Sequence, residues 1–392
     1  MYEDDDFTDD FGAFDAGTAY ALFRHGQDRQ TAQLLQGLGG RGDPEMNIEV
    51  HVHNEDPEEN ARPIEALDFT AIDMPADWDE YVGQEPLKQQ LSVYVTSAKV
   101  RNEALPHILL ASGYPGVGKT TMARLVAKMM GVDIYEIVPP FNINTLVECM
   151  QKLGNRDILF IDEIHKLADN GQRGAEILLK VLEEKVAYMP TGEVIPLADI
   201  TVIGATTDAG KLPKTVLDRF KYKPYFSAYS WPDLAKITVQ FAYRHEAGDL
   251  IDDELAADIA GASRGTPRIL EEMVLAARAM SDTFGRAPTT QELLEFLEVE
   301  PDGLTRVHIH YLTAMRQYFA RMTKDETVEY IVGEAAIQQI LRETKPGLQA
   351  IEGFLVERGL MDRTPRGRRL TDLGIARAEE FIAAGKGATN VA

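Results

Sequence analysis

The chain has 392 residues, of which 44% are hydrophobic, and a formal net charge of −23. This length and composition are typical of a globular protein with two or three domains. The chain has no apolar run of about 18 residues, so no membrane span is predicted. The N-terminus lacks a signal-peptide pattern, and the single cysteine, Cys149, excludes an intramolecular disulfide and fits a reducing cytoplasm. Cys149 lies in an apolar helical segment, so we expect a buried thiol rather than a catalytic one.

Residues 1–65 are predicted to form an acidic, disordered arm. The first 60 residues contain fifteen Asp and Glu against three Arg, which is about half of the net negative charge. A solubilising extension is the favoured interpretation, and a tail that docks a partner or mimics DNA is the alternative. The rest of the chain is only mildly acidic, so any contact with DNA requires a local basic patch.

Residues 66–226 alternate short apolar runs with segments of helical periodicity. The runs at 108–111, 157–161 and 200–205 have the length and apolar character of buried strands. Such alternation predicts an α/β sandwich with a parallel sheet. We therefore assign 66–226 to one α/β domain.

A phosphate-binding loop follows the first predicted strand. It fits the pattern GxxxxGK[ST] and reads Gly113-Tyr114-Pro115-Gly116-Val117-Gly118-Lys119-Thr120. Its glycines let backbone N–H groups surround the α- and β-phosphates, its lysine reaches the β- and γ-phosphates, and its threonine hydroxyl ligates Mg²⁺. A helical segment that Gly131 ends comes next, which places a helix N-terminus beside the phosphates. The loop predicts a site for ATP and Mg²⁺.

Polar side chains follow the other two predicted strands. Asp162 and Glu163 come directly after the second one, at the end of the sheet where ligands bind. Asp162 is expected to hold Mg²⁺ and Glu163 to polarise the attacking water. The pair alone is a weak signal because many strands end in acidic turns, but about 43 residues after Lys119 it becomes a strong one. Thr207 follows the third strand and is expected to orient that water, the alternative being a threonine-rich turn.

Two arginines are candidates for contacts with the γ-phosphate. Arg219 lies at the expected edge of the α/β domain, where it can serve a neighbouring subunit as an arginine finger or pair with Asp218. Residues 227–298 have an almost entirely helical pattern. Within them, Pro267 can open a helix and direct Arg268 toward the nucleotide.

Residues 299–384 have the pattern of a small helical domain that ends in a hairpin, and 385–392 are expected to fray. The densest basic cluster of the chain lies at this hairpin and comprises Arg358, Arg363, Arg366, Arg368 and Arg369. Such arginines can contact DNA phosphates in a sequence-independent manner. The alternative is a solvated hairpin.

These motifs, in this order, resemble the RuvB family, the bacterial AAA+ motors that drive branch migration of Holliday junctions. The resemblance covers roughly residues 75–375, and the run 363–368, Arg-Thr-Pro-Arg-Gly-Arg, is its most discriminating element. It implies an α/β, P-loop AAA+ parallel-sheet sandwich over 66–226, an all-α lid over 227–298 and a C-terminal winged-helix domain over 299–384. It also implies a homo-hexamer that acts on double-stranded or four-way junction DNA.

The resemblance assigns roles to particular residues. It makes Thr207 the sensor 1 residue, Arg219 the trans-acting finger and Arg268 the sensor 2 arginine, and it places Arg363, Arg366 and Arg368 in the element that contacts DNA. With Lys119 and Glu163, Thr207 and Arg219 form the expected catalytic set, and Thr120 and Asp162 the expected Mg²⁺ ligands. The nucleotide contacts that it implies are Tyr81, Val82, Gly113, Tyr114, Pro115, Gly116, Val117, Gly118, Lys119, Thr120, Thr121, Asp162, Tyr229 and Arg268.

Several departures from the family pattern predict a divergent member. Tyr114 and Val117 interrupt the usual loop, and Met74 stands where the family has an arginine near the adenine pocket. The stretch 185–199 is shorter than the hairpin with which the family docks its partner RuvA. The segment 270–273 is acidic where the family is basic.

Three functions are weighed on this basis. The first is a ring ATPase that translocates duplex DNA, with or without a RuvA-like partner. The second is an AAA+ loader or switch that places a replication protein on DNA. The third, a protein-remodelling ATPase, is disfavoured because no aromatic pore loop occurs between Gly131 and Asp157.

Overall fold

The computed structural model describes residues 65–69, 74–169, 172–188, 194–322 and 328–386. The predicted acidic arm, except its last residue, and most of the predicted C-terminal tail lie outside these residues. None of the helices in the described ranges has the length and apolar character that a membrane span requires.

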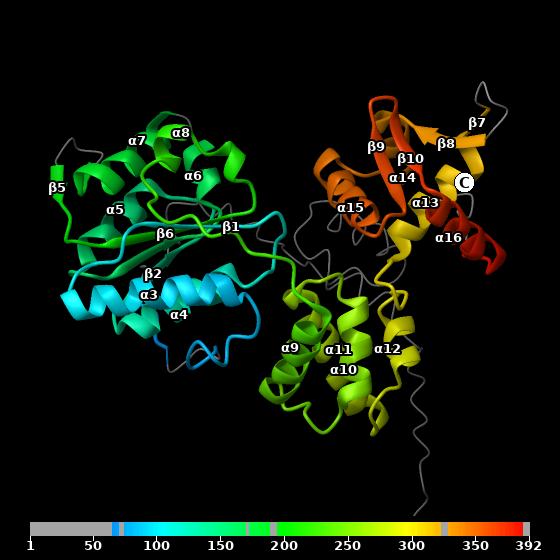
Figure 1. The fold of residues 1–392 in the computed structure, drawn as a ribbon, viewed down its shortest axis with the longest axis horizontal. Helices are drawn as coiled ribbons and strands as arrows, with labels where there is room; N and C mark the ends of the chain where they lie inside the picture. The colour runs from blue at the N-terminus through cyan, green and yellow to red at the C-terminus, as the bar shows by residue number, and fades with distance from the viewer. Residues whose placement is uncertain (1–64, 70–73, 170–171, 189–193, 323–327, 387–392) are drawn as a thin grey trace, which may run out of the picture. The chain divides into compact units, whose positions relative to one another are not determined.

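A four-stranded parallel sheet forms the centre of the nucleotide-binding region (Figure 1). Its strands lie in the order β1 (Ile108–Ala111), β6 (Thr201–Thr206), β3 (Ile158–Ile161) and β2 (Ile134–Ile137). Three of them confirm the predicted strands, and β2 is an addition. A further segment follows the free edge of β1, where Tyr222 accepts a hydrogen bond from Leu109 N at 2.9 Å and Phe226 N donates one to Ala111 at 3.0 Å.

Each face of this sheet is covered by its own helices. Alternate residues of a strand point to opposite faces, so Ile158 and Phe160 join one apolar core while Leu159 and Ile161 join another. The first core packs against α3 (Glu85–Arg101) and α4 (Lys119–Met130). The second packs against α5 (Ile143–Lys152), α6 (Ile164–Asp169), α7 (Gln172–Leu179) with its π-helical continuation η1 (Lys180–Glu184), and α8 (Lys214–Leu217). Cys149 is buried in α5, as predicted, and burial raises its pKa to about 11, which keeps it a protonated, unreactive thiol.

A small antiparallel hairpin follows η1. It pairs β4 (Val186–Tyr188) with β5 (Val194–Pro196), and it occupies the stretch predicted to carry a short hairpin. Its turn lies outside the described residues. The short 3₁₀ helix η2 (Ala209–Lys211) comes after β6.

The next region, predicted to be almost entirely helical, contains four helices with a separate apolar core. They are α9 (Trp231–Arg244), α10 (Asp253–Ala262), α11 (Pro267–Phe284) and α12 (Thr290–Phe296). Local signals set their starts. Ser230 and Asp252 cap α9 and α10 through their side chains, Pro267 is the first residue of α11, and Thr289 forms a capping box with Glu292.

The C-terminal region has the winged-helix fold. Its helices are α13 (Arg306–Tyr318), α14 (Glu334–Leu341), α15 (Lys345–Glu357) and α16 (Asp372–Ala383). Its antiparallel sheet has the order β7 (Ala320–Met322), β8 (Val328–Val332), β10 (Gly367–Leu370) and β9 (Met361–Thr364). The β9–β10 hairpin, called the wing below, is the predicted arginine-rich hairpin. Gly367 is required there because a Cβ atom would lie 2.4 Å from the carbonyl oxygen of Val332.

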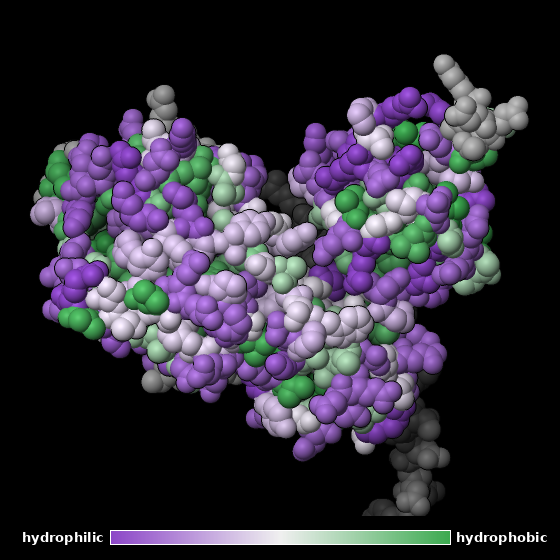
Figure 2. Space-filling model, in the orientation of Figure 1, coloured by the Kyte–Doolittle hydropathy of each residue, from purple (hydrophilic) through white to green (hydrophobic). Residues whose placement is uncertain are grey.

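Together these three regions confirm the predicted fold class: a P-loop AAA+ sandwich, an all-α lid and a C-terminal winged helix. The domain boundaries themselves stay predictions. On the face shown in Figure 2, hydrophilic residues cover most of the surface and apolar side chains occur in small patches.

Candidate functional site

The phosphate-binding loop connects β1 to α4 and depends on two glycines. Gly116 and Gly118 have φ angles of 73° and 91°, which side chains rarely tolerate. A Cβ atom on Gly118 would also lie 2.5 Å from the Tyr81 hydroxyl oxygen, and one on Gly116 would lie 2.9 Å from Cβ of Arg268. The loop therefore needs glycine both for its backbone conformation and for the close approach of its neighbours.

Lys119 is the first residue of α4, and its side chain is buried. Its Nζ donates to Ser112 Oγ at 2.9 Å and approaches the carbonyl oxygen of Tyr114 at 3.4 Å. Burial lowers the pKa of Lys119, and the nearby charges of Asp162 and Glu163 act in the opposite direction. A γ-phosphate would supply a further anionic partner for this ammonium. Sequence reasoning missed Ser112, although it directly follows the first predicted strand.

The two carboxylates at the end of β3 differ in their surroundings. Burial raises the pKa of Asp162, the neighbouring Glu163 raises it further, and the charges of Lys119 and Arg268 lower it. One oxygen of Asp162 accepts the backbone N–H of Glu163 at 2.9 Å. Glu163 itself has a φ of 46°, a left-handed conformation that is uncommon for a residue with a side chain.

Two side chains contact the Glu163 carboxylate. Thr207 Oγ1 donates to its Oε2 at 3.2 Å, and His165 Nδ1 lies 3.2 Å from the same oxygen. His165 Nδ1 also lies 2.9 Å from Thr206 Oγ1. This buried histidine therefore lies between the Glu163 carboxylate and the hydroxyl of Thr206. Thr207 was predicted to act with Glu163, whereas His165 was not singled out.

The residues predicted to hold Mg²⁺ suit that ion chemically. Thr120 offers a hydroxyl and Asp162 a carboxylate, and both are hard oxygen donors. In the described part of the chain, no group of three or more acidic, histidine or cysteine side chains is placed to hold a metal.

A pair of tyrosines donates hydrogen bonds to the backbone of the phosphate-binding loop. Tyr229, just before α9, donates from its hydroxyl to the carbonyl oxygen of Val117 at 3.1 Å, and Tyr81 donates to that of Gly118 at 3.3 Å. The two hydroxyl oxygens are 3.3 Å apart, and burial raises the pKa of both groups. Val82 packs against the core of the helical region. Of the expected nucleotide contacts outside the loop, Tyr81 and Tyr229 thus lie beside it.

The two candidate γ-phosphate arginines have different environments. Arg268 is the second residue of α11 and lies against Gly116, where its charge acts on both Lys119 and Asp162. Arg219 follows α8, and its Nε and Nη2 donate to one oxygen of Glu183 at 2.9 and 2.7 Å. Its ion pair is therefore with Glu183 rather than with the adjacent Asp218. An arginine finger that serves a neighbouring subunit is expected to lie away from the phosphate-binding loop of its own subunit.

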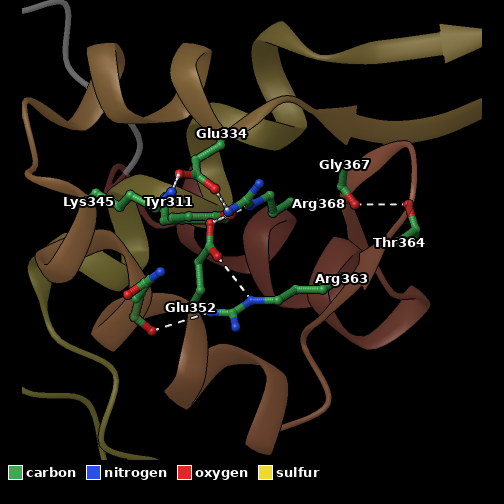
Figure 3. Close-up of polar contacts among 9 residues, drawn as sticks. Tyr311, Glu334, Lys345, Glu352, Arg363, Thr364, Gly367 and Arg368 are labelled. Atoms are coloured by element: carbon green, nitrogen blue, oxygen red, sulfur yellow. Dashed lines mark hydrogen bonds and ion pairs between the residues drawn. The ribbon is translucent and has the colours of Figure 1, made fainter. Parts of the chain in front are cut away.

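The predicted basic cluster is partly neutralised by carboxylates (Figure 3). Arg368 donates to Glu352 at 2.8 Å and to Glu334 at 2.6 Å, and only 16% of its side chain is exposed. Arg363 donates to Glu352 at 3.1 Å but remains 49% exposed. Arg366 is exposed in the turn of the wing. The three predicted DNA contacts are thus unequal in their access to a phosphate.

Two other arginines of the cluster are also engaged. Arg369 donates to Asp362 at 2.9 Å. The guanidinium of Arg358 lies 5.2 Å from the ring centre of Phe354, a cation–π contact, and approaches the carbonyl oxygen of Gly261 at 3.4 Å. These contacts leave Arg363 and Arg366 as the arginines of the wing with the most open side chains.

Comparisons with known families match most of this chain. The model of the "Holliday junction DNA helicase RuvB P-loop domain" matches residues 74–225, and that of the "RuvB C-terminal winged helix domain" matches residues 301–378. Among curated proteins, the Holliday junction branch migration complex subunit RuvB of Lactobacillus johnsonii is 34% identical over 306 residues, which are 74% of this chain and 86% of that protein. The RuvB subunit of Lacticaseibacillus casei is 35% identical over 313 residues, 76% of this chain and 88% of that protein.

Solved structures agree with these matches. The Thermotoga maritima RuvB Holliday junction branch migration motor superposes with a TM-score of 0.64 at 29% identity, over 79% of this chain and 97% of that one. A point mutant of the same protein gives a TM-score of 0.65 at 28% identity, over 80% and 98% of the two chains.

Proposed function

Because this chain belongs to the RuvB family of P-loop ATPases, the family of the Holliday junction branch migration motor, we propose that it hydrolyses ATP to translocate duplex DNA and drives branch migration in recombination and repair. The active form is a homo-hexameric ring in the cytoplasm. ATP binds between subunits, and Arg219 of one subunit reaches the γ-phosphate held by the next.

The observation that carries this proposal is the contact between Thr207 and Glu163 beside Lys119 and Asp162. Phosphoryl transfer needs positioning and charge stabilisation more than covalent chemistry. Lys119 stabilises the charge of the β- and γ-phosphates, and Glu163 polarises a water that Thr207 helps to orient. Thr120 and Asp162 would hold Mg²⁺, which when bound neutralises phosphate charge.

Two contacts support the proposal that a change at the nucleotide moves the lid. Tyr229 and Arg268 belong to the lid region, and they contact the loop at Val117 and Gly116. Loss of the γ-phosphate changes the charge that these groups face, so the lid can rotate against the loop during turnover. The winged helix follows the lid in the chain and would move with it, its wing arginines holding the DNA backbone.

The β4–β5 hairpin lies in the stretch that corresponds to the family's partner-binding hairpin, but it has only three paired residues in each strand, so the proposal does not depend on a RuvA-like partner. The alternative function is a loader or switch ATPase. The neutralisation of Arg368 by two carboxylates favours it, since a protein that places a partner on DNA needs fewer phosphate contacts of its own.

Electron microscopy and ATP hydrolysis assays distinguish the two functions. With a slowly hydrolysed ATP analogue and a four-way junction, the motor forms rings through which a duplex arm passes. Its ATP hydrolysis is stimulated by duplex DNA alone. A loader gives DNA-stimulated hydrolysis without rings around an arm, and hydrolysis indifferent to DNA contradicts both functions.

A further inference from the structure

The wing places two arginines directly opposite each other. Arg363 on β9 and Arg368 on β10 are cross-strand partners in the β9–β10 ladder. Like charges in such a pair destabilise a hairpin. In this protein the carboxylate of Glu352, from α15, lies between them and gives one oxygen to each (Figure 3).

Glu352 is held more tightly than a surface carboxylate. None of its side chain is exposed, and its Oε1 accepts both Arg368 Nε at 2.8 Å and the hydroxyl of Tyr311, on α13, at 3.2 Å. Its Oε2 accepts Arg363 Nε at 3.1 Å. Burial and the adjacent Glu352 raise the pKa of Tyr311, so its hydroxyl keeps the proton that it donates. Contacts to both oxygens from three elements fix the orientation of the carboxylate.

Arg363 and Arg368 differ in how many of their N–H groups remain available to bind an additional ligand. Arg368 gives Nε to Glu352 and Nη2 to Glu334, which also pairs with Lys345. Arg363 gives only Nε to Glu352, apart from a 3.4 Å approach of Nη2 to the carbonyl oxygen of Gln349. Because its side chain is 49% exposed, the outer end of the Arg363 guanidinium faces solvent.

We propose that Glu352 is a positioning residue for DNA binding: it holds Arg363 with its outer N–H groups directed toward a backbone phosphate, while Arg368 serves to anchor Glu352. This inference rests on the proposed function of the wing in DNA binding. The opposite possibility is that Glu352 masks the arginines and competes with phosphate. Its complete burial argues against masking, because a phosphate cannot enter the place that this carboxylate occupies.

Positioning and masking predict opposite effects of Glu352→Gln. The change adds one positive charge per subunit, so masking predicts tighter DNA binding. Positioning predicts weaker binding, because the amide replaces one of the two acceptor oxygens by an NH₂ group that cannot accept, and Arg363 loses its fixed orientation. Arg363→Lys tests the same point without altering the buried group. It keeps the charge, but an ammonium lacks the fork that contacts Glu352 and a phosphate together.

The measurement is binding of the full chain to fluorescently labelled duplex DNA at a series of salt concentrations. Affinity falls as salt rises, and each lost phosphate contact makes the slope of log K against log salt less negative by about 0.9 per engaged wing. Measured against the affinity in 1 M salt, the affinity in 0.1 M salt is then about eightfold lower than for the unaltered chain. We expect this loss for Glu352→Gln and for Arg363→Lys, and no greater loss when the two are combined. A merely structural role would lower the folded fraction without changing the slope.

Glu379→Gln is the matched control. Glu379 accepts two hydrogen bonds from Arg316 in the same domain, outside the Glu352 network, so this variant adds the same charge without disturbing the wing. Unchanged or tighter binding by Glu352→Gln or Arg363→Lys, relative to this control, overturns the proposal. If Glu352→Gln fails to fold, Arg363→Lys alone decides. If the unaltered chain does not bind duplex DNA, the proposed function of the wing fails instead.

Discussion

The ion pair between Arg219 and Glu183 must break before Arg219 can act as a finger in a neighbouring subunit. Glu183→Gln removes the charge that holds the guanidinium and keeps the size of the side chain. Arg219 and Glu183 are 35% and 52% exposed, so the pair is solvated and contributes about 0.5–1 kcal/mol. Its removal is therefore expected to raise the fraction of available fingers, and with it the rate of ATP hydrolysis, by up to about twofold to fivefold.

Steady-state ATP hydrolysis at saturating ATP and Mg²⁺, in the presence of duplex DNA, measures this effect. Glu184→Gln is the matched control, because Glu184 is the adjacent carboxylate and pairs with Lys180 instead. An acceleration specific to Glu183→Gln supports the retracted finger. Equal rates for the two variants would refute the idea that the pair restrains Arg219, and a loss as large as that of Arg219→Ala would place Glu183 inside the working site.

The remaining predictions concern the nucleotide site and acid stability. Lys119→Ala should abolish binding of a fluorescent ATP analogue, whereas Glu163→Gln should bind it normally and stop turnover; normal hydrolysis by the latter would remove Glu163 from its role. Mixing Arg219→Ala with Lys119→Ala subunits should restore part of the ATP hydrolysis that each lacks alone, and no restoration would exclude a finger acting in trans. Burial, with the charge of Arg264, lowers the pKa of His308 to about 4, so protonation below pH 6.5 favours the unfolded chain. The stability from this group is complete above pH 6.5 and lost as pH falls toward 4, about 2 kcal/mol of it by pH 5. Denaturant unfolding should show this loss, and a His308→Gln variant with the same loss would contradict the assignment.

The sequence predicted the elements whose signals are local. Strands β1, β3 and β6 were predicted within one residue, because each is a continuous apolar run buried on both faces. Strand β2 was missed because Glu136 interrupts its apolar pattern. That carboxylate is paired with Arg124 at 2.7 Å, a tertiary contact which the local sequence does not reveal. Strands β7 and β8 were also missed. β8 joins the sheet by pairing with the distant β10, and β7 joins it only through β8.

Some residues of the candidate site could be predicted from local sequence signals, and others could not. The loop and the Asp162–Glu163 pair were predicted because their chemistry depends on fixed spacing and on position at strand ends. His165 and Glu352 were not, because their roles arise from contacts with residues far along the chain, such as Thr206 and Tyr311. For the same reason the sequence could not show that Arg368 is engaged by two carboxylates.

Branch migration of a synthetic four-way junction tests the central claim most directly. The full chain, with ATP and Mg²⁺, is incubated with labelled junctions that have homologous arms, and the products are separated by electrophoresis, with and without a RuvA-like partner. We expect the unaltered chain to convert junctions into duplex products, and Glu163→Gln to bind them without converting them. Junctions that stay intact under every condition, although the protein binds DNA and hydrolyses ATP, would contradict the motor function.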